Sequence, residues 1–572
     1  MDKSQVSSIL NEIGLLLELV GENPFKVRAY YQAARTIEGL DEDLDTLARE
    51  NRLGDVSGLG PALKEKITTL VMTGRLPYYE DLRTQVPPGL LAMLRLPGLG
   101  PRKVQTLHRA LGLTDLAGLE EACREHRVQG LPGFGPKTEL KILAGLEWFA
   151  QRRGQHLWVD AWMAADELRQ SLAALAEVSG IDIAGSLRRR KEIVKDIDLV
   201  AVTAAPAAVA EAFINLPSVG KVNARGETRV AVTLQSGIDV DLRLAAPEAY
   251  AALLLHLTGS KEHNAALRGL AKERGLKLNE YGLYRGDERL PCLSEEEIYR
   301  ALGLQYIPPE LREDLGEIEA AATGNLPPLI EASDVRGALH NHTSASDGTA
   351  SLAEMAAAAA ALGWEYLGLA DHSQSAYYAG GLRPESVLRQ REAVAAHNRT
   401  GRGPYLLAGI ESEIRPDGSL DYPDEILASF DYVVASIHTG MGLGKDEMTA
   451  RILKALRNPH TTILGHPTGR LLLQREAYAI DLDAVLDAAA ANGVAIEINA
   501  SPYRLDLDWR WCQRARDKGL VFWVNPDAHS TRELANYAYG IGVARKGWLR
   551  ADQVGNTWTL AEVWENWRKK RS

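Results

Sequence analysis

Three aspartates in the middle of the chain have the spacing of a divalent-metal site. Asp196 and Asp198 lie two residues apart in a strand-like run, so their side chains should project from the same side of a strand. Asp241 lies in a second run of this kind, residues 238–244. Carboxylates on adjacent strands can hold two magnesium ions about 3.5–4 Å apart, one activating an attacking 3′-hydroxyl and the other neutralising a triphosphate. The three aspartates are therefore candidate metal ligands and catalytic residues.

The segment before this pair has groups that could bind phosphate. Gly185, Ser186 and Arg189 offer backbone and side-chain hydrogen-bond donors. Two aspartates at this spacing are common on surface strands, but the preceding segment and the distant Asp241 together favour a nucleotidyl-transfer site. For the additional carboxylate of Asp239 we expect only a solvated strand position.

A second set of metal-binding residue types fills the carboxyl-terminal part of the chain. Imidazole and carboxylate side chains follow successive apolar, strand-like runs. A single histidine after a strand is usually a core residue, but repetition at five strand ends predicts a β/α barrel with its site at the carboxyl ends of the strands. Mixed ligands of this kind suit zinc, manganese or iron rather than magnesium alone. The candidate ligands are His340, His342, Asp347, His372, Glu411, His438, His466, Asp527 and His529.

A short segment with a Gly-x-Gly-Pro core occurs three times in the first 155 residues, which otherwise show helical spacing and no convincing strand. The copies are residues 56–61, 96–101 and 131–136, each followed by basic side chains. Such a turn exposes backbone N–H groups at the start of the next helix, and these bind phosphate without reading sequence. One copy could be only a tight turn, whereas three predict a DNA-backbone interface through Gly58, Gly60, Gly98, Gly100, Gly133 and Gly135.

The composition is that of an ordinary folded protein. The chain has 572 residues, of which 45% are hydrophobic and 25% charged, and this excludes collagen-like, mucin-like and wholly disordered proteins. A net charge of −11 would argue against a nucleic-acid partner only if the charge were evenly spread. Residues 1–155 carry equal numbers of basic and acidic side chains, so the acidity lies in the rest of the chain. The charge is compatible with DNA binding by the first part.

Cysteine usage and hydropathy indicate the compartment. Cys123, Cys292 and Cys512 lie far apart, which supports neither a disulfide framework nor a thiolate zinc site and suits a reducing environment. The sequence shows no basic segment leading into an apolar core at its start and no uncharged apolar run of about 18 residues. We expect a cytoplasmic protein with no membrane partner.

Taken together, these motifs resemble the bacterial family X DNA polymerases, which are related to DNA polymerase beta, with a PHP domain at the carboxyl end. Residues 185–198 resemble the palm of that family, residues 258–268 and 278–282 its thumb, and the strand-end ligands its PHP domain. The resemblance covers nearly the whole chain and implies a multidomain protein with α+β and α/β parts. The implied units are a lyase-like helical DNA-binding domain, helix-hairpin-helix fingers, a nucleotidyltransferase palm, a thumb, a linker and a distorted β/α barrel, at residues 1–80, 81–155, 156–245, 246–318, 319–335 and 336–572.

The resemblance also implies roles for individual thumb residues. Asn264 would contact the base edge of the incoming nucleotide, and Arg268 would contact the template strand. Where the family commonly has an aromatic pair that helps exclude ribonucleotides, this chain has His256-Leu257, which leaves its sugar discrimination open. Lys195 replaces a glycine that often precedes the aspartate pair, a change that could reshape the triphosphate site.

Lys66 falls where the resemblance implies a lyase nucleophile. The family's lysine attacks a deoxyribose aldehyde as a Schiff-base amine, which requires a depressed pKa. A phosphate-binding cation is an equal alternative for Lys66, and Lys26 and Arg28 could hold a 5′-phosphate. A second lysine of the family corresponds to Ala62 here, which weakens the lyase interpretation.

In the barrel the resemblance implies three metal ions. The implied ligand groups are His340, His342, Glu411 and Asp527; Glu411, His438 and His466; and Asp347, His372 and His529. Ala338 and Glu413 stand where the family often has aspartates, and neither change removes a ligand, although Ala338 could cost a supporting contact.

The expected function is that of a template-dependent DNA polymerase that fills short gaps during base excision repair and carries a metal-dependent 3′–5′ exonuclease or phosphoesterase in its barrel. We expect Mg²⁺ or Mn²⁺ at the polymerase site and up to three Mn²⁺ or Zn²⁺ ions in the barrel. The partners would be gapped or primer–template DNA and deoxynucleoside triphosphates, and the protein would be monomeric and associated with the nucleoid.

Two other functions stay open. In the first, the barrel is the main activity, as a 3′-end-processing nuclease, a phosphatase or an abasic-site endonuclease, and the palm mainly holds DNA. In the second, the chain is a non-catalytic scaffold that binds DNA ends through its repeated turns.

Overall fold

The chain forms two compact units, Met1–Arg153 and Gly154–Ser572. The computed structural model describes residues 3–38, 40, 44–54, 56, 58–94, 96 and 98–571. Of the repeated segments, Ser57 and Pro97 lie outside the described residues. Each unit is considered by itself below.

The first unit is helical throughout its described residues, as the spacing predicts. One core runs through it from Val6 to Leu146, so the segments expected as separate lyase-like and finger domains share their apolar interior. The helices are α1 Lys3–Val20, α2 Pro24–Glu38, α3 Leu44–Arg49, η1 Arg52–Gly54, α4 Pro61–Thr73, α5 Pro77–Gln85, α6 Pro88–Met93, α7 Pro101–Leu111, α8 Leu116–Arg124 and α9 Pro136–Gln151.

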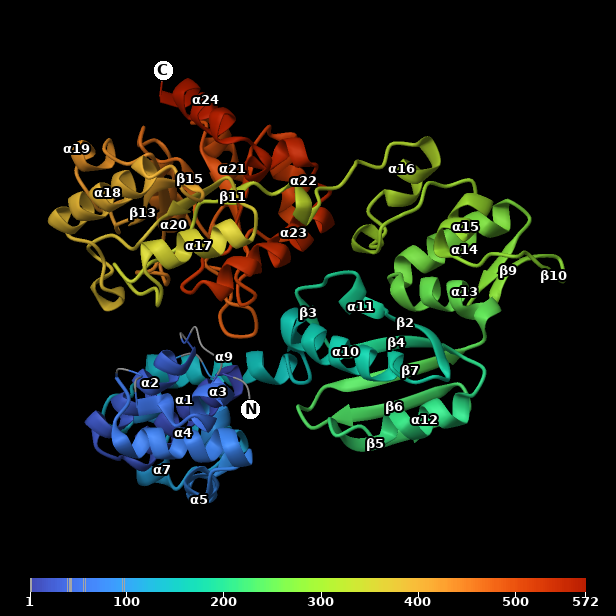
Figure 1. Cartoon of the computed structure of the whole chain (residues 1–572), viewed down its shortest axis with the longest axis horizontal. Helices are drawn as coiled ribbons and strands as arrows, with labels where there is room; N and C mark the ends of the chain where they lie inside the picture. Colours follow the sequence, from blue (N-terminus) through green and yellow to red (C-terminus); the bar gives the residue numbers. More distant parts are fainter. Residues whose placement is uncertain are drawn as a thin grey trace. The chain divides into compact units, whose positions relative to one another are not determined.

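The second unit begins with a five-stranded sheet in the order β2-β4-β7-β6-β5 (Figure 1). Strands β4 and β7 are parallel and the other neighbours are antiparallel. Apolar residues alternate along β6 and β7 because one face packs on a buried core. The elements are β1 His156–Leu157, α10 Trp158–Ala173, β2 Val178–Ile183, α11 Gly185–Arg188, β3 Ile193–Val194, β4 Asp196–Thr203, α12 Pro206–Ile214, β5 Val219–Arg225, β6 Arg229–Leu234 and β7 Asp239–Ala245.

A small helical subdomain with a three-stranded sheet follows. Its last helix runs to Thr323 and contributes Ile318 and Ala321 to its core, so that helix overlaps the start of the segment expected as a linker, 319–335. The elements are α13 Pro247–Thr258, α14 Lys261–Glu273, β8 Lys277–Asn279, β9 Gly282–Arg285, β10 Glu288–Arg289, α15 Glu295–Ala301, η2 Pro309–Leu311 and α16 Glu317–Thr323.

Seven parallel strands form the barrel, hydrogen-bonded in chain order from β11 to β17. A bridge between Asn341 and Ala528 joins the carboxyl ends of the first and last strands. The predicted β/α barrel is thereby confirmed. Its strands are β11 Gly337–Ala338, β12 Tyr366–Leu369, β13 Tyr405–Glu413, β14 Tyr432–Ser436, β15 Ile463–Leu464, β16 Ala495–Asn499 and β17 Phe522–Asn525.

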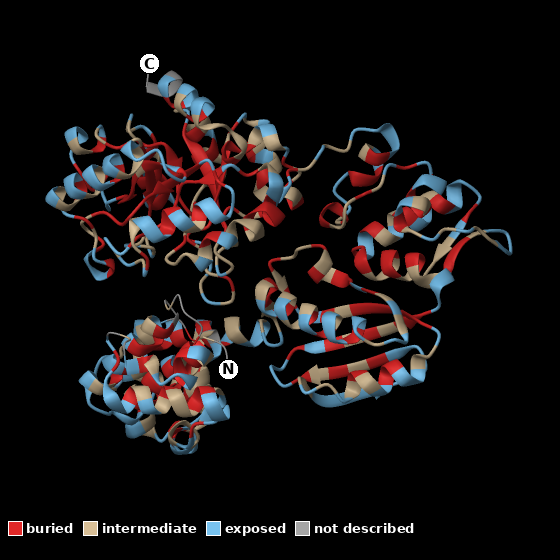
Figure 2. Ribbon diagram, viewed as in Figure 1, coloured by how far each residue is buried: buried red, intermediate tan, exposed pale blue. Residues whose placement is uncertain are grey.

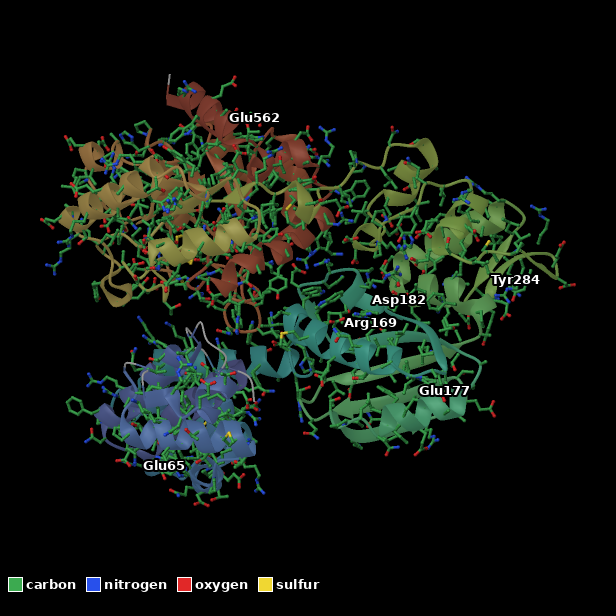
Figure 3. All side chains as sticks on the ribbon, in the orientation of Figure 1. Glu65, Arg169, Glu177, Asp182, Tyr284 and Glu562 are labelled. Atoms are coloured by element: carbon green, nitrogen blue, oxygen red, sulfur yellow. The ribbon has the colours of Figure 1, made fainter. Side chains whose placement is uncertain are left out.

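Helices surround these strands, so the strands are buried on both faces and read as apolar runs (Figure 2). The larger helices are α17 Leu352–Ala361, α18 Pro384–Arg399, α20 Lys445–Leu456, α21 Leu482–Ala491, α22 Trp509–Asp517, α23 Tyr537–Lys546 and α24 Leu560–Arg571. Exposed acids such as Glu65, Glu177, Asp182 and Glu562 are spread over both units (Figure 3). Within the described residues, no helix has the length and apolar character needed to cross a membrane.

A buried ionic network connects the five-stranded sheet, the small subdomain and the barrel. The fully buried Nζ of Lys546 donates to Glu313 Oε1 at 2.6 Å and to the carbonyl oxygen of Arg189 at 3.0 Å. The Nε of Arg189 donates to the same carboxylate at 3.0 Å. Burial alone would raise the pKa of Glu313, but Lys546 and Arg189 lower it to about 2, so the carboxylate stays charged.

Replacing Glu313 with Gln should destabilise the second unit by about 3–5 kcal/mol, because Lys546 would remain buried without its carboxylate. Urea unfolding of the full chain measures this. Glu331, exposed and paired with Arg545, is the matched control, and Glu331→Gln should cost about 1 kcal/mol or less. Equal unfolding midpoints for the two variants would show that the buried network does not stabilise the protein.

Candidate metal centres and DNA-binding sites

All nine ligand candidates of the barrel meet in one cluster at the carboxyl ends of its strands, which is buried except for the partly exposed Asp347 and His529. Glu411, at the end of β13, is its centre and is 1% exposed. Its carboxylate oxygens lie 2.8–3.8 Å from ring nitrogens of His340, His342, His372, His438 and His466. Histidines from four strand ends, those of β11, β12, β14 and β15, therefore converge on one carboxylate.

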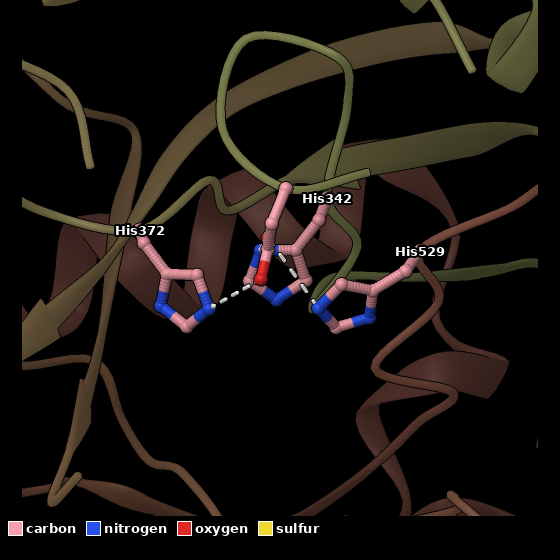
Figure 4. Close-up of side chains that lie close together, drawn as sticks. His342, His372 and His529 are labelled. Atoms are coloured by element: carbon pink, nitrogen blue, oxygen red, sulfur yellow. Dashed lines mark ion pairs between the residues drawn. The ribbon is translucent and has the colours of Figure 1, made fainter. Parts of the chain in front are cut away.

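Asp347 is the second focus of the cluster. Figure 4 shows His342, His372 and His529 turned toward a shared carboxylate. The ring nitrogens lie 3.5–3.7 Å from the Asp347 oxygens. Three sets of ligand atoms are close enough to hold a metal ion: His342, Asp347, His372 and His529; His340, His342 and Asp527; and His372, Glu411 and His438.

These sets overlap with the expected ligand groups without coinciding with them. His342 belongs to two sets, and His372 lies with Glu411 and His438 as well as with Asp347. His466 approaches Glu411 at 3.0 Å. The geometry therefore brings the nine residues together, and the division of ligands among individual ions stays a prediction.

The chemistry of the cluster fits divalent cations. Several buried ligand atoms lack a hydrogen-bond partner among the described residues although ligand atoms of other side chains lie close by: His340 Nε2, His342 Nδ1, His372 Nδ1 and Glu411 Oε2. Buried polar atoms without partners are costly unless an ion satisfies them. Burial alone would raise the pKa of Glu411, but His438, His340 and His372 hold it well below its usual range, so the carboxylate is ready to bind a cation.

A further layer of polar residues orients the ligands, and sequence reasoning did not find most of it. Glu497 Oε1 lies 2.8 Å from His340 Nδ1, and its other oxygen accepts from the backbone N–H of His466 at 2.6 Å. Asn499 donates to Asp527 at 3.0 Å. Such partners fix the tautomer and direction of a metal ligand. The available signal was two polar residues, two apart, in the otherwise apolar run 495–499.

Glu413, noted as a departure from the family, has a similar role. Its Oε2 lies 2.8 Å from His438 Nδ1, and its Oε1 accepts from the hydroxyl of Thr439 at 2.7 Å. The change from aspartate therefore leaves a carboxylate that supports His438.

The aspartates of the five-stranded sheet lie as their spacing predicts. In the parallel pair β4–β7, Asp198 is opposite Asp241 and Asp196 is opposite Asp239. Burial, followed by the charges of Asp196 and Asp241, raises the pKa of Asp198 to about 7. Asp241 accepts from Arg229 Nε at 2.7 Å, a cation that partly balances the group. Mutual repulsion of this kind is what a bound divalent ion relieves.

Position 185 requires a glycine, because its backbone lies directly against the Asp198 side chain. Its φ is +65°, and a Cβ atom at this position would lie 2.1 Å from Asp198 Oδ2. Ser186 follows it in the short helix α11. Arg189 is buried with Glu313 in this structure, so its predicted contact with phosphate would require that ion pair to open. The phosphate roles of all three residues stay predictions.

In the small subdomain, Asn264 and Arg268 lie on α14 and line one hollow together with His256. Asn264 Nδ2 donates to the carbonyl oxygen of His256 at 2.6 Å, and Arg268 is exposed. The nucleotide contact of Asn264 and the template contact of Arg268 stay predictions.

The three repeated turns share one backbone conformation. The first glycine of each, Gly58, Gly98 and Gly133, has a left-handed φ of 81–85°. The second glycine has an extended backbone at the start of α4, α7 or α9 and precedes a proline in the first helical turn. Among the described residues, no atom lies within 4 Å of a Cβ built on the second glycines, Gly60, Gly100 and Gly135, so these helix starts are open to a phosphate.

Lys66 of α4 lies in an aromatic environment. Its Nζ donates to the hydroxyl of Tyr30 at 2.8 Å and lies 3.9 Å from the ring centroid of Tyr78. Burial, followed by the charge of Lys26, lowers the pKa of Lys66. A lowered pKa increases the fraction of neutral amine, the form that acts as a nucleophile.

Comparisons with known proteins agree with this geometry. Family models match four parts of the chain: a helix-hairpin-helix domain (residues 1–76), a SAM-like helix-hairpin-helix tandem (90–147), the DNA polymerase beta thumb (253–313) and the PHP domain (338–501). The DNA polymerase/3′-5′ exonuclease PolX of Bacillus subtilis (strain 168) is 38% identical over 98% of this chain and 99% of its own length.

Two shorter relatives match only part of the chain. A probable phosphatase of Thermoanaerobacter sp. (strain X514) is 30% identical over 27% of this chain and 65% of its own length. A probable phosphatase of Caldanaerobacter subterraneus subsp. tengcongensis is 30% identical over 35% of this chain and 78% of its own length.

Removing the central carboxylate should remove bound metal. For Glu411→Gln we expect a loss of at least about one ion per chain after dialysis, because several imidazoles converge on this anionic ligand. Mass spectrometry of metal content measures the loss. Glu392→Gln, an exposed change on α18, should retain the full complement. Equal metal content in the two variants would contradict the assignment of the barrel cluster.

Proposed function

The chain belongs to the family of the bacterial DNA polymerase/3′-5′ exonuclease PolX, and from this membership we propose that it is a DNA-directed DNA polymerase that fills short gaps during repair. We also propose a 3′–5′ exonuclease in the barrel. The observation that carries the proposal is the presence of two separate carboxylate centres in one chain that aligns with PolX along nearly its whole length.

We assign the parts of the chain as the resemblance implies. Residues 1–80 and 81–155 would bind DNA as lyase-like and helix-hairpin-helix segments of one helical unit, with the palm at 156–245. The thumb would occupy residues 246–318, followed by a linker at 319–335 and the PHP barrel at 336–572.

The palm would perform nucleotidyl transfer. Mg²⁺ or Mn²⁺ ions held by Asp196, Asp198 and Asp241 would supply positive charge beside the primer 3′-hydroxyl and the triphosphate. Arg229 donates a hydrogen bond to Asp241 and must release this carboxylate when the ions bind. Gly185 keeps the space beside Asp198 open.

Other groups would orient the nucleotide and the template. Ser186 and the backbone of Gly185 offer donors for phosphate oxygens, joined by Arg189 once it leaves Glu313. Asn264 would contact the base edge of the nucleotide, and Arg268 the template strand.

The barrel would hydrolyse phosphate esters at DNA 3′ ends. Up to three Mn²⁺ or Zn²⁺ ions on the nine ligands would supply Lewis acidity to that reaction. Glu497, Glu413 and Asn499 would hold the ligands in place before substrate arrives. We propose gapped or primer–template DNA and deoxynucleoside triphosphates as substrates, bound by a monomer associated with the nucleoid.

A second proposed activity is 5′-deoxyribose phosphate lyase chemistry by Lys66. Its half-buried amine and lowered pKa favour this role over that of a simple phosphate-binding cation. Lys26 lies close to Tyr78, 5.7 Å from the ring centroid, and with Arg28 would hold the 5′-phosphate.

The two alternative functions, a 3′-end-processing enzyme and a DNA-binding scaffold, would each need only some of these sites. A 3′-end-processing phosphatase or nuclease would need the barrel alone, as in the shorter relatives described as probable phosphatases. A scaffold would need only the three turns. The carboxylate group on β4 and β7 favours the polymerase over both, because neither alternative requires it.

Loss of the palm carboxylates should separate the two activities. Replacing Asp196 and Asp198 with Ala should reduce nucleotide incorporation at a gap by about 100-fold or more, because the ions that activate the primer end would no longer bind. A labelled-primer assay measures incorporation, and primer shortening in the absence of nucleotides should be unchanged. Asp239→Ala is the control on the same face of β7. Incorporation that survived in the double variant would contradict the polymerase assignment.

The role of Lys66 can be separated from simple phosphate binding. Lys66→Arg keeps the positive charge but removes the nucleophilic amine, so it should abolish borohydride trapping on DNA with a 5′-deoxyribose phosphate and retain binding to that DNA. Lys64→Arg, in the same helix, should trap normally. Trapping by the Lys66 variant at the wild-type level would rule out this lysine as the nucleophile.

A further inference from the structure

Two exposed tyrosines lie beside the barrel's metal cluster. Tyr377 and Tyr378 form the short helix η4, residues Tyr377–Ala379, and are 86% and 62% exposed. The Tyr378 ring lies 6.4 Å, between ring centroids, from that of the ligand His372 and 6.3 Å from that of Tyr377. An aromatic pair therefore extends from a metal ligand to solvent, and none of the steps above uses it.

The loop beneath the tyrosines is held in place. The backbone N–H of Leu382 donates to the carbonyl oxygen of His372 at 2.8 Å, and that of Ser375 donates to Asp421 at 2.7 Å. A Cβ on Gly381 would lie 2.0 Å from the carbonyl oxygen of Ser373. The exposed rings are thus carried on a fixed turn that packs closely on the strand-end segments.

Arg504 provides a cation at the same cluster. Its side chain is 18% exposed, and its Nε lies 3.7 Å from Asp527 Oδ2. Its buried Nη1 has no hydrogen-bond partner among the described residues. A guanidinium held beside metal ligands with a free N–H is suited to an anionic oxygen that enters with the substrate.

Resting on the proposed exonuclease, we propose that Tyr377, Tyr378 and Arg504 form the entry site for the unpaired 3′ end of a DNA strand. The two rings stack on the terminal bases, and Arg504 binds an oxygen of the phosphate that faces the metal cluster. Every base has an aromatic face, so stacking of this kind accepts any sequence. The substrate class is therefore a single-stranded 3′ terminus.

This site distinguishes a nuclease from a phosphatase. A phosphomonoester needs only the metal cluster and a cation such as Arg504, whereas exposed rings beside the cluster contribute only when a base is present. The contact between the Tyr378 ring and that of the ligand His372 places the aromatic pair beside the cluster and not on a remote surface.

The test compares the double variant Tyr377→Ala/Tyr378→Ala with wild-type full chain loaded with Mn²⁺. Two substrates are used, a duplex with an unpaired 3′ tail and the small ester glycerol 2-phosphate, which has no ring that could stack. Loss of stacking should raise KM for the tailed duplex by about 10-fold or more and leave hydrolysis of the small ester unchanged. The variant Tyr377→Ala/Tyr378→Phe should have a KM for the tailed duplex closer to that of wild type, because a phenyl ring still stacks.

A second readout does not depend on cleavage. With Ca²⁺ in place of Mn²⁺ and 2-aminopurine as the last base of the tail, wild-type protein should quench the fluorescence of that base, and the double alanine variant should not. Tyr405→Ala, at the opposite end of strand β13, is the matched control and should behave as wild type. Arg504→Gln should lower kcat on both substrates while leaving the quenching intact.

The outcomes separate the two proposals. If wild-type protein fails to shorten the tailed duplex, the exonuclease itself is wrong. If wild-type protein shortens it and the double alanine variant matches wild type in KM and in quenching, the exonuclease stands and the tyrosine entry site is wrong. Equal KM defects on the small ester and the duplex would also overturn the entry site, because they would indicate damage to the metal cluster.

Discussion

The second unit is organised around buried or half-buried carboxylates whose charge must be balanced by positive groups beside them. In the barrel, Glu411 is buried among five imidazoles. In the palm, the neighbouring aspartates and burial raise the pKa of Asp198 to about 7. Charged groups in such positions require positive charge nearby, and bound cations are the simplest source. The fold supplies rigid strands that keep each set together before the cation arrives.

The two centres differ in the types of side chain that they offer to a cation. The palm has oxygen ligands and an arginine partner, which suits a hard ion that arrives with a triphosphate. The barrel has mixed imidazole and carboxylate ligands fixed by Glu497, Glu413 and Asn499, which suits ions that stay bound between turnovers. Lys546 and Glu313 connect palm, thumb and barrel through a buried ion pair, so the centres belong to one compact unit.

Much of this arrangement could be predicted from the sequence, because the relevant signals are local. Alternation places Asp196 and Asp198 on one face, and a parallel barrel must bring its strand ends together. The contacts of Arg189 and the role of Glu497 could not be predicted, because they depend on tertiary partners more than 100 residues away. The place of Ile318 and Ala321 in the core of the small subdomain likewise becomes visible only in the packed structure.

The central claim is that one chain both extends and shortens the same primer end. The most direct measurement follows a 5′-labelled primer on a gapped duplex, in Mg²⁺ or Mn²⁺, with and without deoxynucleoside triphosphates. The account predicts extension that stops when a short gap is filled, and stepwise shortening when nucleotides are withheld. Shortening in both conditions with no extension would leave only the barrel activity and contradict the account.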